Sequence, residues 1–381
     1  MKITILKEKL KEGISIIEKI SAKSISLPIL NNILFSVEKN FLNLVATDLE
    51  MGIKWWTLVK TEEEGQMAIP SKILSSFVNF LPNKSVSLQS KGFDLEIECD
   101  NHKTMVKGVN PEDFPIIPKV SDEEKIEVPA GSFCKGLSSV VDIASFSSTK
   151  PEISGIYFLF QKNMITMAAT DSFRLGERKL YLEGSSEIGK EYSFILPQKA
   201  AREIINIFGE KEDSLTICFS PNQILFETAL PGTKNPEVQL TSRLVEGDYP
   251  NYQEIIPKKY ETRVTLSLED FINQVKLASL FSGKINEVKL KIDATKGQVD
   301  FLSQNAEVGE YQSFLTGKVE GKPCEISFNH RFLLDGLSNI NLRQQKKPEV
   351  VLELSGPEKP AVLKLKGEEN YLYLIMPIKN D

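Results

Sequence analysis

The chain has 381 residues, of which 41% are hydrophobic and 26% charged, and its formal net charge is −6. This length and composition are typical of a soluble globular chain of roughly two to three domains. No apolar run approaches the ~18 residues that a membrane helix requires, so we expect no membrane partner. Charges interrupt the opening MKITILKEKL where a signal peptide is apolar, which predicts a cytoplasmic protein.

The sequence contains few residues that could bind a metal ion or carry out redox chemistry. There are only two histidines, His102 and His330, and neither has another histidine or a cysteine at ligand spacing. The cysteines lie far apart and are expected to be reduced thiols: Cys99, Cys134, Cys218 and Cys324. Zinc sites and relays of two histidines are therefore close to excluded, and we expect no metal, cofactor or catalytic residue.

One segment, Gly184–Lys190, has the spacing of a phosphate-binding loop. The next residue is Glu191, where such a loop places the Ser or Thr that binds magnesium, and a carboxylate there would repel phosphate. We therefore interpret this segment as a polar loop.

The first predicted elements are a short β-strand from Ile3 and an amphipathic helix with apolar residues at Leu10 and Ile14. The same pair recurs from Ile126 and again from Val264. Self-similarity at such a long period indicates that the chain is built from copies of one structural unit.

A strand–turn–strand block follows in every copy. Asn32–Asp48 aligns with Gly155–Asp171, and both segments end in Ala-Thr-Asp. The third copy, Glu287–Phe301, keeps the rhythm but lacks Thr-Asp. Asp48 and Asp171 could form a catalytic carboxylate pair, but their repetition favours a residue that caps the same turn twice.

A second strand-to-helix unit closes the pattern in three segments: Met67–Leu74, Phe194–Ala201 and Ile326–Leu333. Pro70 and Pro197 stand where the helix begins, since a proline needs no N–H there. In the third copy Asn329 can cap the helix instead.

These repeats predict an α+β protein of three domains, 1–122, 123–254 and 255–381, separated near Val120–Glu124 and Pro250–Lys258. Each domain would hold two helices and about eight strands, and the short turns favour antiparallel sheets with one face on the helices.

Charge is divided between the helices and the remaining chain. The six predicted helices with their flanks sum to +8, which leaves −14 of the total of −6 to the strands and loops. The helix segments are Lys7–Ile20, Pro70–Lys84, Ala130–Lys150, Pro197–Lys211, Ser267–Lys284 and Asn329–Lys347. One interpretation is simply that helices tolerate lysine and loops tolerate aspartate. The alternative is a basic helical surface for a polyanion.

Ring geometry favours the second interpretation. Three repeats with unpaired terminal strands form an arc, and two such chains would close it into six domains with twelve inward helices. At a packing distance of ~9.5 Å, twelve helix axes lie on a circle ~36 Å across. Subtracting ~10 Å for helix thickness leaves a hole of ~26 Å. A DNA duplex roughly 20 Å wide would pass through it, held by phosphate contacts alone.

Five motifs in this order resemble the bacterial sliding-clamp family, the beta subunits of DNA polymerase III: Leu27–Asn31, Ala46–Glu50, Ala169–Leu175, Glu246–Tyr252 and Tyr373–Ile378. The resemblance runs along the whole chain. It implies three repeated DNA-clamp domains that close as a dimer into a six-domain ring without catalytic activity. The implied partners are a second copy, double-stranded DNA of any sequence, an ATP-driven clamp loader, the DNA polymerase III catalytic subunit and other replication and repair proteins.

The resemblance also implies one peptide-binding pocket per chain. Its residues would be Ile153, Thr170, Ser172, Phe173, Arg174, Leu175, Pro250, Ile255, Asn329, Phe332, Pro360, Leu374, Met376, Pro377 and Ile378. Arg174 could orient a peptide carbonyl or carboxylate. The alternative for the apolar members is ordinary core packing.

This sequence departs from the family's pattern at the pocket. Ser172 and Phe173 stand where the family usually has Gly followed by His or Tyr, and Phe332 stands where Tyr is common. The tail continues through Lys379–Asp381, which could alter the pocket rim.

Candidate DNA-facing residues are Lys7, Lys11, Lys23, Lys72, Lys150, Lys199, Arg202, Lys276, Arg331, Arg343, Lys346 and Lys347. The resemblance further suggests a dimer contact in which the edge at Thr104–Val106 pairs with the partner's third domain. Leu280 and Phe281 would pack beside it, and Lys72 would face Glu307 or Glu310. Such an exposed ion pair contributes about 0–1 kcal/mol.

Two other functions stay open. The runner-up is a repeat-built scaffold that binds proteins and never encircles DNA. An enzyme acting through the duplicated carboxylates is a distant third.

Overall fold

The computed structural model describes residues 1–21, 27–120, 124–145, 149–182, 190–233, 235–340 and 346–379, which form 26 strands and six α-helices. Contacts divide the chain into two compact units. Unit 1 holds Met1–Gly131 and Asn206–Leu244, and unit 2 holds Ser132–Ile205 and Val245–Asp381. The expected loop at 184–189, the predicted basic residues Lys23 and Arg343, and the tail residues Asn380 and Asp381 lie outside the described residues.

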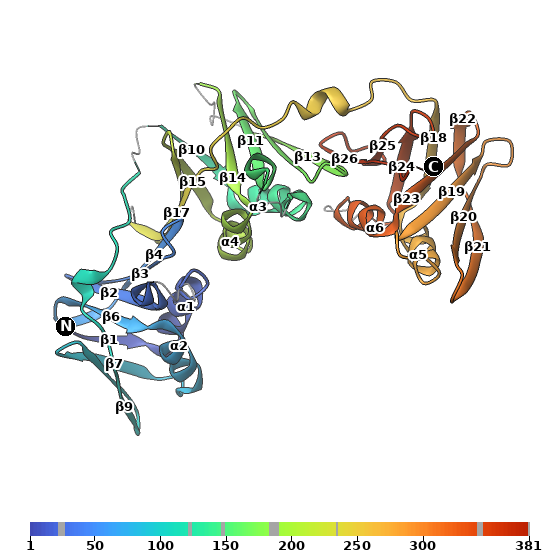
Figure 1. The fold of residues 1–381 in the computed structure, drawn as a ribbon. Helices are drawn as coiled ribbons and strands as arrows, with labels where there is room; N and C mark the ends of the chain where they lie inside the picture. The colour runs from blue at the N-terminus through green and yellow to red at the C-terminus, as the bar shows by residue number, and fades with distance from the viewer. Residues whose placement is uncertain are drawn as a thin grey trace. The chain divides into compact units, whose positions relative to one another are not determined.

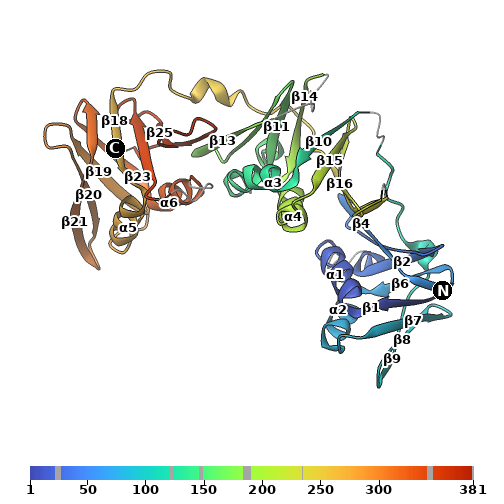
Figure 2. The same cartoon turned by 180° about the vertical axis from the view of Figure 1, so that it is seen from behind.

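Unit 1 contains two antiparallel sheets (Figures 1 and 2). The five-stranded sheet has the order β5 (Lys60–Glu63), β1 (Lys2–Leu6), β7 (Ser85–Lys91), β8 (Asp94–Cys99), β9 (His102–Val106). The eight-stranded sheet has the order β10 (Lys125–Pro129), β15 (Ser214–Phe219), β16 (Gln223–Ala229), β17 (Pro236–Arg243), β4 (Met51–Leu58), β3 (Phe41–Thr47), β2 (Asn32–Glu38), β6 (Gly65–Pro70). Pairing of β17 with β4 joins strands of the second repeat to strands of the first.

Unit 2 also contains two antiparallel sheets. The nine-stranded sheet has the order β14 (Tyr192–Pro197), β11 (Gly155–Gln161), β12 (Met164–Thr170), β13 (Arg174–Tyr181), β26 (Tyr371–Ile375), β25 (Ala361–Leu365), β24 (Glu349–Leu354), β18 (Thr262–Ser267), β22 (Lys318–Gly321). The four-stranded sheet has the order β21 (Gly309–Thr316), β20 (Gln298–Asn305), β19 (Glu287–Asp293), β23 (Cys324–Asn329). Here β13 of the second repeat pairs with β26 of the third.

The predicted repeat of two helices per copy is confirmed. The helices are α1 (Lys7–Ile17), α2 (Ser71–Phe80), α3 (Ala130–Ser138), α4 (Gln198–Phe208), α5 (Leu268–Ser279) and α6 (His330–Asn339). The segment Ala130–Lys150 was predicted as a helix with its flanks; in the structure α3 ends at Ser138, and a 3₁₀ turn, η3 (Val141–Ile143), follows.

Local sequence explains where the helices begin and which face they bury. In α1 the apolar residues Leu10, Ile14 and Ile17 are buried, as their spacing predicts. The Asn329 side chain accepts a hydrogen bond from the N–H of Arg331 at 3.0 Å and caps α6, which confirms that prediction. Pro70 is the residue just before α2, and Pro197 ends β14 just before α4.

Close packing in unit 1 makes Gly13 of α1 a sensitive position. A Cβ atom there would lie 2.4 Å from Cε3 of Trp55, which is buried in β4. We expect Gly13→Ala to lower the free energy of unfolding by about 1–3 kcal/mol, because the ring must shift in a packed core. Urea unfolding followed by tryptophan fluorescence measures this loss, since both tryptophans, Trp55 and Trp56, lie in unit 1.

Gly131 in α3 is the matched control for this substitution. A Cβ atom there would meet only the carbonyl oxygen of Lys211, at an ordinary 3.7 Å. Gly131→Ala is therefore expected to be neutral or to stabilise the protein by up to about 1 kcal/mol. Equal losses for the two variants would contradict the packing argument.

Candidate functional site

The turn between β12 and β13 in unit 2 is closed by the side chains of Thr170 and Asp171. Asp171 Oδ1 accepts hydrogen bonds from the N–H groups of Phe173 at 2.9 Å and Arg174 at 3.0 Å. The Thr170 hydroxyl donates to the carbonyl of Arg174 at 2.7 Å and accepts from the N–H of Ser172, which has φ 77°. This turn leaves the Phe173 side chain 60% exposed at its tip.

The turn between β3 and β4 in unit 1 repeats this pattern. Asp48 Oδ1 accepts from the N–H groups of Glu50 at 3.0 Å and Met51 at 2.7 Å, and the Thr47 hydroxyl donates to the carbonyl of Met51 at 2.7 Å. Leu49 has φ 76°, which matches Ser172. The prediction that Thr-Asp caps the same turn twice is confirmed, and each carboxylate has a structural role.

An apolar cluster in unit 2 gathers side chains from four strands and one turn. Its buried members are Ala168 on β12, Leu175 on β13, Val362 on β25, Leu374 on β26 and Tyr252 in the 3₁₀ turn η5 (Tyr252–Ile255). Leu374 lies opposite Leu175 in one strand pair and opposite Val362 in the other. The structure therefore brings the predicted residues Leu175 and Leu374 together, although each is buried to 1% exposure or less.

Partly buried side chains surround this cluster: Tyr157, Tyr249, Ile256, Tyr260, Leu372 and Met376. Met376 was predicted for the site, whereas the tyrosines were missed. The rings of Tyr157 and Tyr249 stack with centroids 5.1 Å apart. The available signal was the segment from Tyr249 to Tyr252, which places two aromatic residues next to the predicted Pro250.

A buried hydrogen bond holds η5 against β13. The Tyr252 hydroxyl donates to Oε2 of Glu177 at 2.7 Å, and both side chains are buried. Burial, together with the Glu177 carboxylate, raises the pKa of Tyr252 well above its usual range. The Tyr252 hydroxyl therefore stays protonated, and its hydrogen bond fixes the ring within the cluster.

A second apolar surface lies beside the cluster, at the tip of the Thr170 turn. The rings of Phe173 and Phe332 stack with centroids 6.2 Å apart, and the Arg174 guanidinium lies 4.7 Å from the Phe332 centroid. Both phenylalanines stand at departures from the family's pattern. At these two positions an exposed aromatic ring therefore stacks on a half-buried one.

Arg174 is held by groups of its own chain. Its Nε donates to Asp171 Oδ2 at 2.9 Å, one Nη donates to Asp335 of α6, and the other donates to the carbonyl of Asp142 at 3.2 Å. Its side chain is only 11% exposed. These bonds tie the β12–β13 turn to η3 and α6, so Arg174 shapes the site and has few donors left for a ligand.

The end of the chain forms one wall of the site. The N–H of Met376 donates to the carbonyl of Phe173 at 2.8 Å, and the N–H of Ile378 donates to the carbonyl of Ser327 at 2.8 Å. The Tyr373 hydroxyl donates to the carbonyl of Phe332 at 2.7 Å. The end of the chain is therefore bonded to the β12–β13 turn and to β23, and Tyr373 on β26 is bonded to the first turn of α6.

The predicted pocket residues differ in exposure. Ile153, Thr170, Leu175 and Leu374 are buried; Ser172, Phe173, Pro250 and Ile255 are exposed. The others are half-buried: Arg174, Asn329, Phe332, Pro360, Met376, Pro377 and Ile378. A ligand could therefore contact mainly the exposed and half-buried residues, while the buried residues pack beneath them.

The corresponding place in unit 1 is closed. Gly52 of β4 lies opposite Thr241 of β17, as Leu175 lies opposite Leu374 in unit 2. A Cβ atom on Gly52 would meet Cδ1 of Ile117 at 2.6 Å. In unit 1 the side chain of Ile117 therefore covers the position that corresponds to Leu175 in unit 2.

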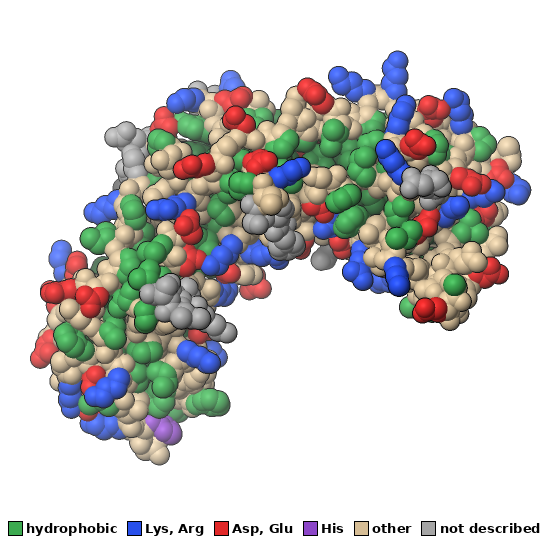
Figure 3. All heavy atoms as spheres, viewed as in Figure 1, with side chains coloured by type: hydrophobic (Ala, Val, Ile, Leu, Met, Phe, Trp, Pro, Cys, Tyr) green, Lys and Arg blue, Asp and Glu red, His purple; other side chains and the backbone are tan. Residues whose placement is uncertain are grey.

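Ten of the twelve predicted DNA-facing residues lie in the described part of the chain. Seven of them are on helices, namely Lys7 and Lys11 on α1, Lys72 on α2, Lys199 and Arg202 on α4, Lys276 on α5 and Arg331 on α6. Lys150 and the pair Lys346 and Lys347 lie beyond helix ends. All except the half-buried Lys7 are exposed, and Arg202 pairs with Asp142 at 2.7 Å. Figure 3 shows acidic and basic side chains interspersed over the face seen there.

Three of the predicted dimer residues lie on edge strands, namely Thr104 and Val106 on β9 and Glu310 on β21. In the described part of the chain, no strand pairs with the outer edge of β9 or of β21. Val106 is buried in its own sheet, whereas Met105 between the predicted residues is 43% exposed. Leu280 is 67% exposed after α5, and Phe281 stacks on Tyr311 of β21 at 5.8 Å.

Sequence reasoning missed two exposed apolar residues of α2. Ile73 is 59% exposed and Phe80 is 89% exposed. Both lie on the helix that also carries Lys72, one of the predicted interface residues. The sequence does show that both are apolar residues lying outside the buried face that Leu74 and Val78 form.

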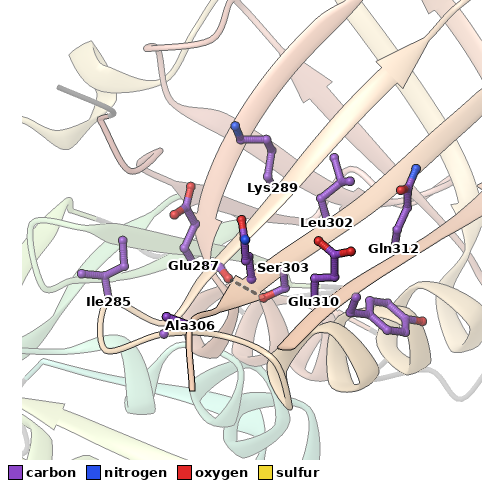
Figure 4. A pocket seen from close by; sticks show the side chains of 11 residues that line it. Ile285, Glu287, Lys289, Leu302, Ser303, Ala306, Glu310 and Gln312 are labelled. Carbon is purple, nitrogen blue, oxygen red and sulfur yellow. Dashed lines mark hydrogen bonds between the residues drawn. The ribbon is translucent and has the colours of Figure 1, made fainter. Parts of the chain in front are cut away.

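A cavity of about 600 Å³ lies against the four-stranded sheet of unit 2 (Figure 4). Its labelled lining residues include Glu287, Lys289, Leu302 and Glu310, one of the predicted interface residues. The Ser303 hydroxyl donates to the carbonyl of Glu287 at 3.2 Å. The lining combines both charges with the apolar side chains of Ile285, Leu302 and Ala306, whereas the buried members of the cluster beside β26 carry no charge.

In the residues that the structure describes, no group of three or more His, Cys, Asp or Glu side chains is placed to hold a metal ion. Burial raises the pKa of the Cys134 thiol to about 12, which keeps it protonated and unreactive. Within the same residues no helix combines the length and apolarity needed to cross a membrane.

Three sequence-family models match the chain in succession. They are the N-terminal domain of the DNA polymerase III beta subunit over residues 1–118, its central domain over 127–251 and its C-terminal domain over 253–379. A beta sliding clamp from Staphylococcus aureus is 29% identical over 365 residues, which cover 93% of each chain. The Staphylococcus epidermidis protein of the same name is 29% identical over 364 residues, also 93% of each.

Solved structures share this fold over their full length. A DNA polymerase sliding clamp from Bacillus subtilis has a TM-score of 0.92 at 23% identity, and coverage is 100% of both chains. A sliding clamp from Pseudomonas aeruginosa bound to griselimycin has a TM-score of 0.92 at 20% identity, with the same coverage. With three family domains in order and full-length relatives, the chain belongs to the DNA polymerase III beta subunit family, the bacterial sliding clamps.

Proposed function

We propose that this protein is a DNA sliding clamp, a ring-shaped homodimer that encircles duplex DNA and tethers polymerases to it. The observation that carries the proposal is the unbroken succession of three beta-subunit domains along one chain, each with two helices. A tether of this kind needs no reaction of its own, and both repeated aspartates already serve as turn acceptors. We therefore propose a non-catalytic subunit that works in the cytoplasm, where the bacterial chromosome lies.

The ring would consist of six domains, three from each chain, with boundaries near 122 and 254. Its closure would pair β9 of one chain with β21 of the other, since both are sheet edges with unpaired backbone groups in the described chain. The exposed apolar residues Ile73, Phe80 and Met105 would pack against the partner subunit's Leu280 and Phe281. The exposed Lys72 would face the exposed Glu307 or Glu310 of the partner subunit.

Duplex DNA would pass through the ring and contact lysine and arginine side chains on helices and helix ends, which in the described chain are exposed except for the half-buried Lys7. Such side chains neutralise phosphates without reading base edges, which suits a protein that must slide. We propose that the ten described basic residues, together with Lys23 and Arg343, supply these contacts.

Partner peptides would bind over the apolar cluster of unit 2. Exposed or half-buried Phe173, Ile255 and Met376 offer apolar contact, while buried Leu175 and Leu374 form a rigid floor. This surface suits a short peptide with aliphatic or aromatic anchors. We propose that the clamp loader, the DNA polymerase III catalytic subunit and other replication and repair proteins share this site.

Topological retention tests the proposed function directly. Protein loaded on nicked circular DNA should remain bound through gel filtration at roughly 0.5 M salt, where purely electrostatic contacts are weak. Cutting the circle once should release it, because a closed ring slides off a free end. A protein-binding scaffold that never encircles DNA would behave alike on circular and linear DNA, and that result would reject the clamp.

A further inference from the structure

An aspartate on α6, Asp335, binds the Arg174 side chain at the edge of the peptide site. Nη1 of Arg174 donates to Oδ2 of Asp335, and this contact lies at the protein surface, where the Asp335 side chain is 51% exposed. Asp335 lies inside the helix, where aspartate is a weak helix former. Helix formation therefore does not explain an aspartate at this position.

Close packing of α6 on β26 brings Asp335 within reach of Arg174. A Cβ atom on Gly336 would lie 2.5 Å from ring carbons of Tyr373, so a larger residue there would push the helix away from the strand. The Tyr373 hydroxyl donates to the carbonyl of Phe332, one turn earlier on α6, at 2.7 Å. Because Arg174 lies opposite Ile375 in the β13–β26 pair, the same strand supports both the helix and the arginine.

The hydrogen bonds of Arg174 occupy all three nitrogens of its guanidinium group. Nε donates to Asp171 at 2.9 Å, Nη2 donates to the carbonyl of Asp142 at 3.2 Å, and Nη1 donates to Asp335. Two of these acceptors, Asp171 and Asp335, are carboxylates that face one guanidinium charge. The guanidinium lies 4.7 Å from the Phe332 ring centroid, so this arginine borders the apolar rings at the rim of the site.

We propose that Asp335 is a specificity-determining residue of the peptide site, because by holding Nη1 of Arg174 it keeps the guanidinium from binding a carboxylate of the ligand. This inference rests on the proposed function, since it concerns the same site. A ligand carboxylate beside Phe332 must displace Asp335, and it also meets the negative charge of Asp171. The site therefore selects peptides by their apolar anchors, and a terminal carboxylate gains nothing from Arg174.

Loss of the Asp335 carboxylate should change this preference. The contact between Nη1 and Asp335 lies at the surface, so without the aspartate this N–H group faces solvent and can donate to a ligand. Nε and Nη2 keep their bonds to Asp171 and Asp142, which hold the guanidinium in place. A hydrogen bond between a guanidinium and a carboxylate is stronger than one between neutral groups, so a carboxylate ligand should gain affinity.

Two peptides that differ only in their last chemical group test the proposal. The clamp-binding peptide of a DNA polymerase III catalytic subunit, shortened to end at its aromatic anchor, is made with a free C-terminal carboxylate and with a carboxamide. Fluorescence anisotropy with the full-length protein measures both affinities. We expect the unaltered protein to bind the carboxylate peptide no more tightly than the carboxamide peptide. Asp335→Ala should bind the carboxylate peptide about tenfold more tightly than the carboxamide peptide.

Two further variants separate this role from a change in charge or in folding. Glu269→Ala, at an exposed residue near the start of α5, changes the net charge equally and should leave the preference as it is. Asp335→Glu keeps a carboxylate at the position and should restore the behaviour of the unaltered protein. Alanine is a strong helix former, so Asp335→Ala should fold, and circular dichroism of each variant checks this.

Three results would overturn the proposal. If Asp335→Ala weakens both peptides equally, Asp335 has only a structural role. If the unaltered protein already prefers the carboxylate peptide tenfold, Asp335 does not withhold Arg174 from the ligand. If the unaltered protein binds neither peptide, the peptide site of the proposed function fails as well, which distinguishes that failure from the first two.

Discussion

Replacing Leu280 and Phe281 together by alanine is expected to convert the dimer to monomers at nanomolar concentration. Leu280 is 67% exposed, and Phe281 lies beside the unpaired edge strand β21, stacked on Tyr311. Buried apolar anchors at an interface contribute about 2 kcal/mol each when truncated. Two anchors are lost at each of the two interfaces of the ring, so the dimer dissociation constant should rise at least about a thousandfold. Sedimentation velocity or native mass spectrometry across a concentration series measures this rise.

The control is Tyr181→Ala, which truncates a side chain that is 54% exposed at the last residue of β13, a residue to which we assign no partner contact. It should leave the dimer intact. Phe80→Ala should weaken the dimer from the other side, because Phe80 of α2 is 89% exposed and would be covered by the partner. A double variant at Leu280 and Phe281 that stays fully dimeric at nanomolar concentration would disprove this interface.

Most of the fold was predictable from the sequence because its signals are local and repeated. Apolar spacing at Leu10 and Ile14 identified α1, and Asn329 identified the start of α6. The duplicated Thr-Asp turn was predictable for the same reason, since Thr170 and Asp171 bond to backbone groups within four residues. The end of α3 was not, because the turn after Ser138 carries no glycine or proline signal.

The candidate site was predictable only in part because its contacts join distant segments. Leu175 and Leu374 came from the family's motifs, and strand pairing between β13 and β26 brings them together. Nothing local links Tyr252 to Glu177, since 75 residues separate them, so this buried bond was missed.

For Arg174, the motif predicted the position of the residue in the site but not its hydrogen-bond partners. Its place in the motif suggested a contact to peptide, but Asp335 lies 161 residues away and became its partner only through the packing of α6. Long-range polar pairs of this kind carry no periodic signal, whereas a hydrophobic face does. The sequence therefore locates the surface better than it assigns the polar groups that shape it.

The prediction with the largest effect on partner binding concerns the tail. Deleting Met376–Asp381 is expected to reduce the affinity for the clamp-binding peptide of a DNA polymerase III catalytic subunit at least about a hundredfold. The deletion removes Met376 from the rim of the apolar cluster and two backbone bonds, to Phe173 and Ser327. Fluorescence anisotropy with a labelled peptide measures the loss.

The rest of the ring should survive this deletion, because β26 ends at Ile375 and keeps its pairs with Arg174 and Ala361. Dimerisation and retention on circular DNA should be unchanged, with passive ring opening in place of the loader, since the loader would use the same surface. A shorter deletion, Lys379–Asp381, is the matched control: it keeps Met376 and the bond from Ile378 to Ser327, so peptide affinity should stay the same. Undiminished affinity after the longer deletion would place the peptide site elsewhere, whereas equal losses in both would assign it to the last three residues rather than to the apolar cluster.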